Sequence, residues 1–140
     1  MIKGIEHVGI AVKSLDEALR FYRDVLELSI ASTGDGPRYK TAFAPAGEAE
    51  LEFLEDLSPQ GIIARHIERR GEGFQHLALT VDDLELTLEE LRKKGIMPIA
   101  DGTAPNIPRL VAWLHPRSTH GVLIELCDKR YRSEREKRGR

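Results

Sequence analysis

Two histidines and two glutamates stand at matching places of the chain, and these residue types could bind a divalent metal ion. His76 follows His7 by 69 residues, and the apolar residues that come after the two histidines match at that offset without a gap. Glu52 lies 45 residues after His7 and Glu125 lies 49 residues after His76, each within an apolar run. A pattern repeated at a fixed offset indicates one supersecondary unit used twice.

The chemistry that such a set of residues supports is that of a Lewis-acid site. Two imidazoles and two carboxylates suit Mn, Co, Ni or Zn better than Ca or Mg alone. Four protein ligands on an octahedral ion leave two positions, which two neighbouring oxygens of a substrate could fill. We therefore predict a metal site made of His7, Glu52, His76 and Glu125.

A structural role for each of these residues is the alternative interpretation. A single histidine on a strand is more often structural or solvated than a metal ligand. Glu52, with Glu50 and Glu55 close by in the sequence, could lie at an exposed edge. The occurrence of all four residues across a repeat favours the metal site over these separate explanations.

The residues around each histidine alternate as in a β-strand. In residues 5–12 the bulky side chains of Val8, Ile10 and Val12 share one face, and His7 shares the other face with small residues. The second copy presents its histidine in the same way. A carboxylate or imidazole on the small-residue face of a buried strand needs a cation or water nearby, because an unpaired buried charge costs several kcal/mol.

An amphipathic helix is predicted after each of these strands. Ser14–Glu17 forms a capping box, and apolar residues at three-and-four spacing continue to about Leu26. In the second copy Asp82 with Glu85 is predicted as the cap and Gly95 as the stop. Ser58 and Pro59 are predicted to open a connecting helix over residues 62–69.

Three further strands complete each copy, so that each reads βαβββ and the chain is of the α+β class. The predicted strands cover residues 29–33, 39–44 and 49–54 in the first copy and residues 97–100, 110–114 and 122–127 in the second, where residues 101–108 form a loop.

Length and composition indicate an ordinary globular protein of 140 residues. The formal charge of −2 argues against nucleic-acid binding, and no apolar run approaches the roughly 18 residues needed to span a membrane. The single cysteine, Cys127, cannot form an internal disulfide, so we expect a cytoplasmic protein.

One domain over residues 1–128 is expected, made of a module (1–57), a connecting helix (58–72) and a second module (73–128). The remaining residues 129–140 form a basic tail with seven Lys or Arg and two Glu. We expect this tail to be solvated and frayed. The alternative is that its positive charge attracts an anionic substrate.

Three motifs resemble the vicinal oxygen chelate superfamily, also described as the glyoxalase/bleomycin resistance/dioxygenase superfamily, and within it most closely the methylmalonyl-CoA epimerases. The resemblance covers about residues 3–128. The motifs are HVGIAV from His7 to Val12, RGEG from Arg70 to Gly73 ahead of His76, and LHPRSTHGVLIEL from Leu114 to Leu126.

This resemblance implies two tandem βαβββ modules that form a curved mixed sheet around a metal-binding cavity, in a homodimer. It implies a small acyl-CoA substrate and an epimerase that interconverts the R and S forms of methylmalonyl-CoA through a metal-stabilised enolate. Inversion needs a proton-transfer group on each side of the planar intermediate. Glu125 is expected on one side, and Glu52 or Lys40 on the other.

Other activities of the same superfamily remain as alternatives. A glyoxalase I-like lactoylglutathione lyase would use the same metal set, although residues 116–121 do not match the motif usual in glyoxalases. Residues 104–108 stand where the epimerases usually carry a glycine-rich loop, which leaves the acyl group open. A ring-cleaving dioxygenase would need a site with only one carboxylate. A non-catalytic small-molecule binder would normally have lost the metal residues.

Overall fold

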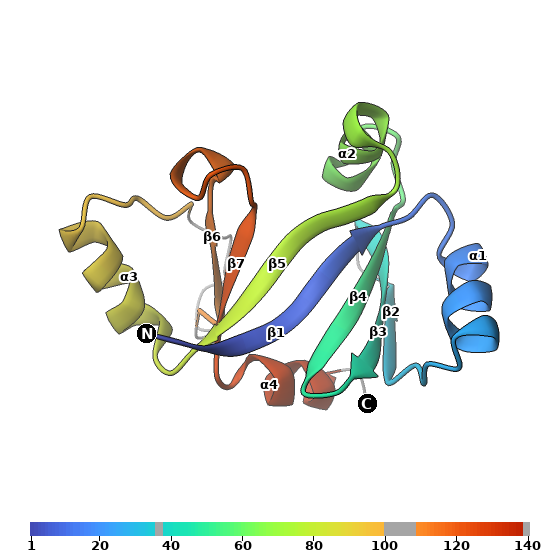
Figure 1. The fold of residues 1–140 in the computed structure, drawn as a ribbon, viewed down its shortest axis with the longest axis horizontal. Coiled ribbons are helices and arrows are strands. Elements are labelled where there is room, and N and C mark those ends of the chain that lie inside the picture. The colour runs from blue at the N-terminus through green and yellow to red at the C-terminus, as the bar shows by residue number, and fades with distance from the viewer. Residues whose placement is uncertain (36–37, 100–108, 139–140) are drawn as a thin grey trace. The chain divides into compact units, whose positions relative to one another are not determined.

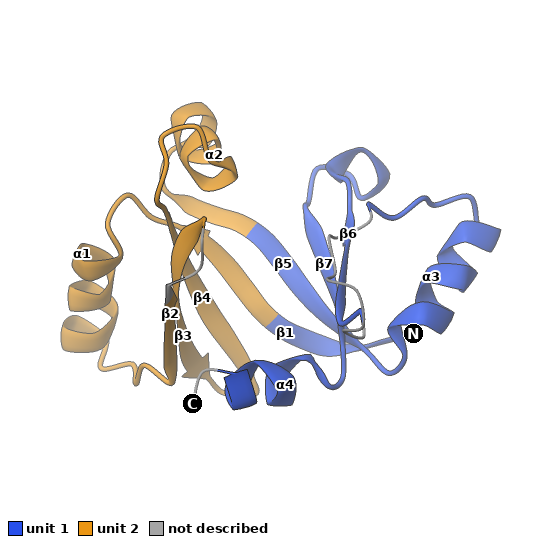
Figure 2. Ribbon diagram, turned by 180° about the vertical axis from the view of Figure 1, so that it is seen from behind, with its two compact units in different colours: residues 1–6, 76–138, 140 blue, residues 7–75, 139 orange. Residues whose placement is uncertain are grey.

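The computed structural model describes residues 1–35, 38–99 and 109–138 of the chain. These residues form two compact units, one of residues 7–75 and the other of residues 1–6 together with residues 76–138 (Figures 1 and 2). The boundary between the units runs through two strands, β1 (Ile2–Ala11) and β5 (Gly73–Val81). None of the helices in the described ranges is both long and apolar enough to cross a membrane.

The unit of residues 7–75 has the predicted βαβββ order. After β1 it contains α1 (Leu15–Leu19), the π-helical η1 (Arg20–Val25), β2 (Ser32–Asp35), β3 (Tyr39–Ala46), β4 (Ala49–Asp56) and α2 (Ile62–Arg70). β4 pairs in parallel with β1 and antiparallel with β3, and β3 pairs antiparallel with β2. The strands predicted over 39–44 and 49–54 are confirmed, whereas the strand predicted over 29–33 begins only at Ser32.

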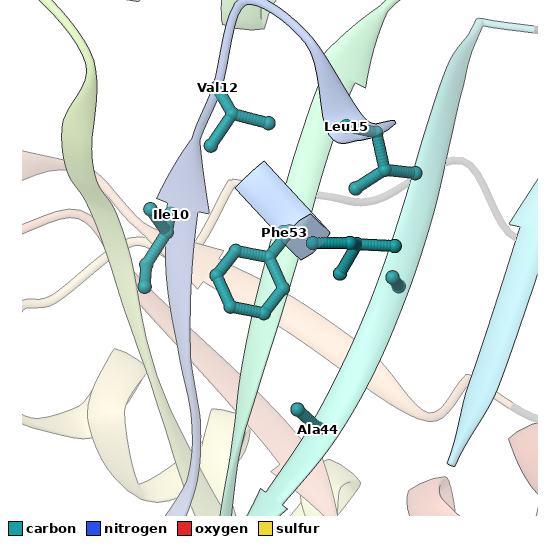
Figure 3. Packing of buried hydrophobic residues seen from close by; sticks show 7 residues of the cluster. Ile10, Val12, Leu15, Ala44 and Phe53 are labelled. Atoms are coloured by element: carbon teal, nitrogen blue, oxygen red, sulfur yellow. The ribbon is translucent and has the colours of Figure 1, made fainter. Parts of the chain in front are cut away.

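The core of this unit lies on one face of these strands, where α1 packs. Leu15 and Leu19 of α1 pack with Ile10 of β1 and Phe53 of β4 (Figure 3). The predicted role of Ser14 as the N-cap is confirmed, because the backbone N–H of Glu17 donates to the Ser14 hydroxyl at 3.2 Å. The opposite face of β1 and β4 is therefore the one that carries the candidate ligands.

Within the described residues, the second unit repeats the same plan with one strand fewer after its first helix. Besides β5 it contains α3 (Leu84–Lys93), β6 (Val111–Leu114), the 3₁₀ turn η2 (Pro116–Ser118), β7 (Ile124–Asp128) and α4 (Tyr131–Arg138). β7 pairs in parallel with β5 and antiparallel with β6. Of the strand predicted over 97–100, the described residues 97–99 form only an isolated bridge, from Ile99 to Trp113. Residue 100 and the predicted loop over 101–108 lie outside the described residues.

Two predicted helix caps were also wrong, because a neighbouring aspartate caps α3 and no side chain caps α2. Asp83 rather than Asp82 caps α3, accepting the backbone N–H of Leu86 at 3.0 Å, while Asp82 pairs with Lys3 at 2.8 Å. Helix α2 begins after Gly61, without a side-chain cap. One N–H group of its first turn is satisfied from outside the helix, because Asp56 accepts the backbone N–H of Ala64 at 2.7 Å.

The prediction of a frayed C-terminal tail was wrong as well. Residues 131–138 form helix α4, and its arginines contact the first strand of the same unit. The Arg132 Nε donates to Glu6 at 3.1 Å, and only 4% of Glu6 is exposed. A buried carboxylate requires such a partner, which supplies a physical reason for ordering the tail.

Candidate metal and proton-transfer site

The first pair of candidate ligands lies within the unit of residues 7–75. His7 on β1 is fully buried, and its Nε2 lies 3.5 Å from Oε1 of Glu52 on β4. In the strand register Glu52 lies beside Gly9, whose lack of a side chain leaves the glutamate room on this face. Phe43, directly across from Glu52 on β3, meets the His7 ring edge-on with centroids 5.6 Å apart.

The second pair repeats this arrangement within the other unit. His76 on β5 is buried, and its Nε2 lies 3.1 Å from Oε2 of Glu125 on β7. Glu125 lies beside the small Ala78 in the register. Trp113, directly across from Glu125 on β6, meets the His76 ring edge-on with centroids 5.1 Å apart.

The geometry of each pair fits metal ligation. Two ligand atoms bound to one ion at about 2.0–2.2 Å lie roughly 3 Å apart, close to the 3.5 Å and 3.1 Å separations of the two pairs. All four side chains are buried, where a carboxylate needs a cation, supplied by either a metal ion or a protonated imidazole. The structure thus brings together His7 with Glu52 and His76 with Glu125, and the joining of the two pairs around one ion stays a prediction.

An aromatic side chain beside each histidine is a feature that sequence reasoning missed. Neither Trp113 nor Phe43 is among the site residues predicted from the sequence. Both lie on the strand that pairs antiparallel with the glutamate strand, opposite the glutamate. The signal was available in the repeat, because an aromatic residue stands at nearly the same offset in each copy.

Glu50 is a further buried carboxylate on the ligand face that sequence reasoning did not assign. It is 3% exposed and lies beside His7 in the β1–β4 register. Because side chains alternate along β4, Glu50 faces the same side as Glu52. The face of β4 therefore carries two acids along one row.

Lys40 lies on the other face of the sheet. It pairs with Glu55 in the register of β3 and β4, three residues from the pair of Phe43 and Glu52. Alternation then turns Lys40 to the side of Ala42, which belongs to the core under α1. This orientation separates Lys40 from the candidate ligands.

The strand of Glu125 ends in Asp128, which holds the start of helix α3. Its carboxylate accepts the backbone N–H of Leu84 at 3.1 Å and the side chain of Arg130 at 2.7 Å. Burial acts to raise the pKa of Asp128, but the hydrogen bonds from Arg130 and Leu84 and the positive charge of Arg130 together hold it below its ordinary value. Asp128 is thus a carboxylate that these hydrogen bonds hold in place and keep negatively charged.

The histidines outside the repeat have local roles. Nδ1 of His115 accepts the backbone N–H of Arg117 at 3.1 Å, which fixes the turn at η2. Burial and the charge of Arg70 lower the pKa of His66 on α2. A backbone hydrogen bond with Phe74 acts to raise this pKa, but its effect is smaller. Neither residue lies on a strand that carries a candidate ligand.

Comparison with known proteins agrees with this architecture. An uncharacterized protein of Bacillus subtilis (strain 168) is 32% identical over 132 residues, covering 89% of this chain and 91% of that protein. The mitochondrial methylmalonyl-CoA epimerase of Mus musculus is 29% identical over 126 residues, covering 87% of this chain and 71% of the epimerase. The crystal structure of methylmalonyl-CoA epimerase from Mycobacterium tuberculosis superimposes with a TM-score of 0.80 at 30% identity, covering 91% and 88% of the two chains.

The family model described as Glyoxalase/Bleomycin resistance protein/Dioxygenase superfamily matches residues 4–126, which include both pairs of candidate ligands. The resemblance inferred from the motifs is thereby confirmed, as is the α+β glyoxalase-like fold. This chain belongs to the Glyoxalase/Bleomycin resistance protein/Dioxygenase superfamily.

Proposed function

We propose that this chain is a metal-dependent epimerase that interconverts the R and S forms of methylmalonyl-CoA. The observation that carries the proposal is the duplicated pair of buried side chains, an imidazole and a carboxylate 3.5 Å apart in one unit and 3.1 Å apart in the other. The similarity to proteins named methylmalonyl-CoA epimerase supports the choice of acyl-CoA substrate.

His7, Glu52, His76 and Glu125 are the residues that would hold the ion, which we expect to be Co, Mn, Ni or Zn. When bound, the ion supplies Lewis acidity that stabilises negative charge on substrate oxygens. The two imidazole ligands are neutral donors, so the two carboxylates balance the charge of a divalent cation. Phe43 and Trp113 pack edge-on against the two histidine rings and restrict their rotation.

The carboxylates also carry the proton transfer in this proposal. The hydrogen on the carbon between the thioester and carboxylate carbonyls is acidic, and Glu125 takes it from one side of that carbon. Return of a proton to the opposite side requires a second group, for which Glu52 is our choice. Lys40 is the poorer choice, because the β3–β4 register turns it to the α1 face.

The direct test is to incubate one methylmalonyl-CoA epimer with metal-loaded protein in deuterated water. We expect racemisation together with incorporation of deuterium at the α-carbon, because the second group delivers a deuteron taken from solvent and not the proton that Glu125 removed. Absence of both from protein that demonstrably contains metal would remove the epimerase assignment. A glutathione hemithioacetal assay in parallel detects the alternative lactoylglutathione lyase activity, and metal retention without either activity indicates a binding protein.

The assembly and the location of the protein are two further expectations. We expect a homodimer, as the family resemblance implies, and a cytoplasmic location, as the single cysteine indicates. Light scattering on the purified protein measures the mass of the assembly. These expectations are independent of the chemistry above.

A further inference from the structure

Helix α4 binds the strand segment that leads into His7. Arg132 makes three hydrogen bonds to Glu6: Nε to Oε1 at 3.1 Å, Nη2 to Oε2 at 3.2 Å, and Nη2 to the backbone carbonyl oxygen at 2.9 Å. Nη1 of Arg135 lies 3.7 Å from the same carboxylate. Helix α4 lies beyond residues 4–126, which match the family model, so the arginines of these contacts lie outside the family match and Glu6 lies within it.

The third of these hydrogen bonds concerns the peptide group that joins Glu6 to His7. A peptide group is planar, so an arginine that holds its carbonyl oxygen fixes the orientation of the following N–H as well. The direction in which the His7 side chain leaves β1 depends on that orientation. Arg132 spans 126 residues of sequence to reach this one peptide, and the fork of its guanidinium fits the Glu6 carboxylate with two parallel bonds.

The contacts within α4 and its flanks also bear on the alternative role of the basic segment as an aid to an anionic substrate. Arg130 pairs with Asp128 at 2.7 Å and Lys137 pairs with Glu134 at 2.9 Å. Arg132 and Arg135 pair with Glu6 in addition. Most of the Lys and Arg residues of the segment therefore form ion pairs with acids of the same unit. The segment therefore fits a structural clamp better than a docking surface for an anion.

We propose that Arg132 is a positioning residue that fixes His7 for metal binding by holding the Glu6–His7 peptide. This inference rests on the proposed function, because it takes His7 as a ligand. Groups that orient a metal ligand through hydrogen bonds typically change metal affinity by about 10- to 100-fold when they are removed. We expect an effect of that size from the loss of the Arg132 contacts.

The test uses the full chain, freed of metal, and Co²⁺ alone as the probe. Arg132→Gln removes the charge and the fork, Arg132→Lys keeps the charge without the fork, and Arg138→Gln is the matched control in the same helix, since Arg138 is exposed. Calorimetric titration well below the unfolding midpoint measures the Kd for Co²⁺. We expect Kd to rise about 10- to 100-fold in Arg132→Gln, less in Arg132→Lys, and to stay unchanged in the control.

A purely structural role for Arg132 would lower the unfolding midpoint and leave the Co²⁺ affinity of the folded protein unchanged, and that result would overturn the proposal. If Arg132→Gln does not fold, the Arg132→Lys variant decides in the same way. Failure of the proposed function has a different signature, in which the wild-type protein itself binds no Co²⁺. Hydrogen exchange of the His7 amide in metal-free protein reports on the clamp without any ion. We expect it to be faster in Arg132→Gln than in the wild type and unchanged in Arg138→Gln.

Discussion

The backbone N–H of Leu84 donates a hydrogen bond to the carboxylate of Asp128, with 3.1 Å between the Leu84 nitrogen and Oδ2. The other unit contains the same bond, from Leu15 to Glu55 at 3.2 Å. Each accepting acid follows the candidate ligand glutamate of its strand by three residues. Both units therefore tie the first turn of the helix to the strand that carries the glutamate.

Replacement of Asp128 by Asn should destabilise the protein. Loss of the negative charge weakens the bonds from Leu84 and Arg130, and a buried hydrogen bond to a charged group, such as the one from Leu84, contributes about 1.5–3 kcal/mol. We expect the free energy of unfolding to fall by about 1–2 kcal/mol, measured by urea denaturation. Asp83→Asn is the matched control, because Asn caps a helix as well as Asp does, and an equal loss in both variants would contradict this role.

The depressed pKa of Asp128 also predicts how stability depends on pH. A carboxylate whose pKa is lower in the folded than in the unfolded protein binds fewer protons when folded, so stability rises with pH across that interval. The contribution of Asp128 should be complete above the ordinary unfolded value of about 3.9 and be lost as pH falls below it. The acid limb of the stability curve should therefore be shallower in Asp128→Asn, and identical limbs in the two proteins would contradict the assignment.

The alternation of side chains was the part of the fold that the sequence could predict. In residues 5–12 and 49–54 each side chain faces opposite to its neighbours, which correctly placed His7 away from the core of Ile10 and Phe53. The same rule predicts that Glu50 faces the same side as Glu52, but the neighbouring acids also left an exposed edge open as the alternative for this strand. Burial depends on what packs above a strand, which is not a property of the strand's own sequence.

Contacts between distant segments were the part that could not be predicted. The charge pattern of residues 129–140 is that of a solvated tail, and its order comes from Glu6 at the other end of the chain. Likewise, α3 is capped by Asp83 and not by the predicted Asp82, which pairs with Lys3. In each case a local pattern offered two acceptable structures, and a partner remote in sequence selected one.

Replacement of His76 by Ala should abolish retention of the metal ion. The imidazole supplies one of the four proposed ligands, and its loss also leaves the buried Glu125 without the partner seen at 3.1 Å. Elemental analysis of protein dialysed after loading with Co²⁺ measures the retained ion. His66→Ala on helix α2 is the control and should retain as much as the wild type, whereas stoichiometric Co²⁺ in His76→Ala would show that the ligand set is wrong.

Replacement of Glu52 by Gln separates ligation from proton transfer at that position. The amide oxygen can still donate to a metal ion, but the amide cannot take up or return a proton. We expect Glu52→Gln to retain Co²⁺ and to lose about 10²- to 10⁴-fold in racemisation, the usual contribution of a positioned acid or base. Glu50→Gln is the matched control on the same face of β4, since Glu50 is equally buried but lies beside His7 in the register. If racemisation is lost in Glu50→Gln and kept in Glu52→Gln, then the second proton-transfer group is Glu50.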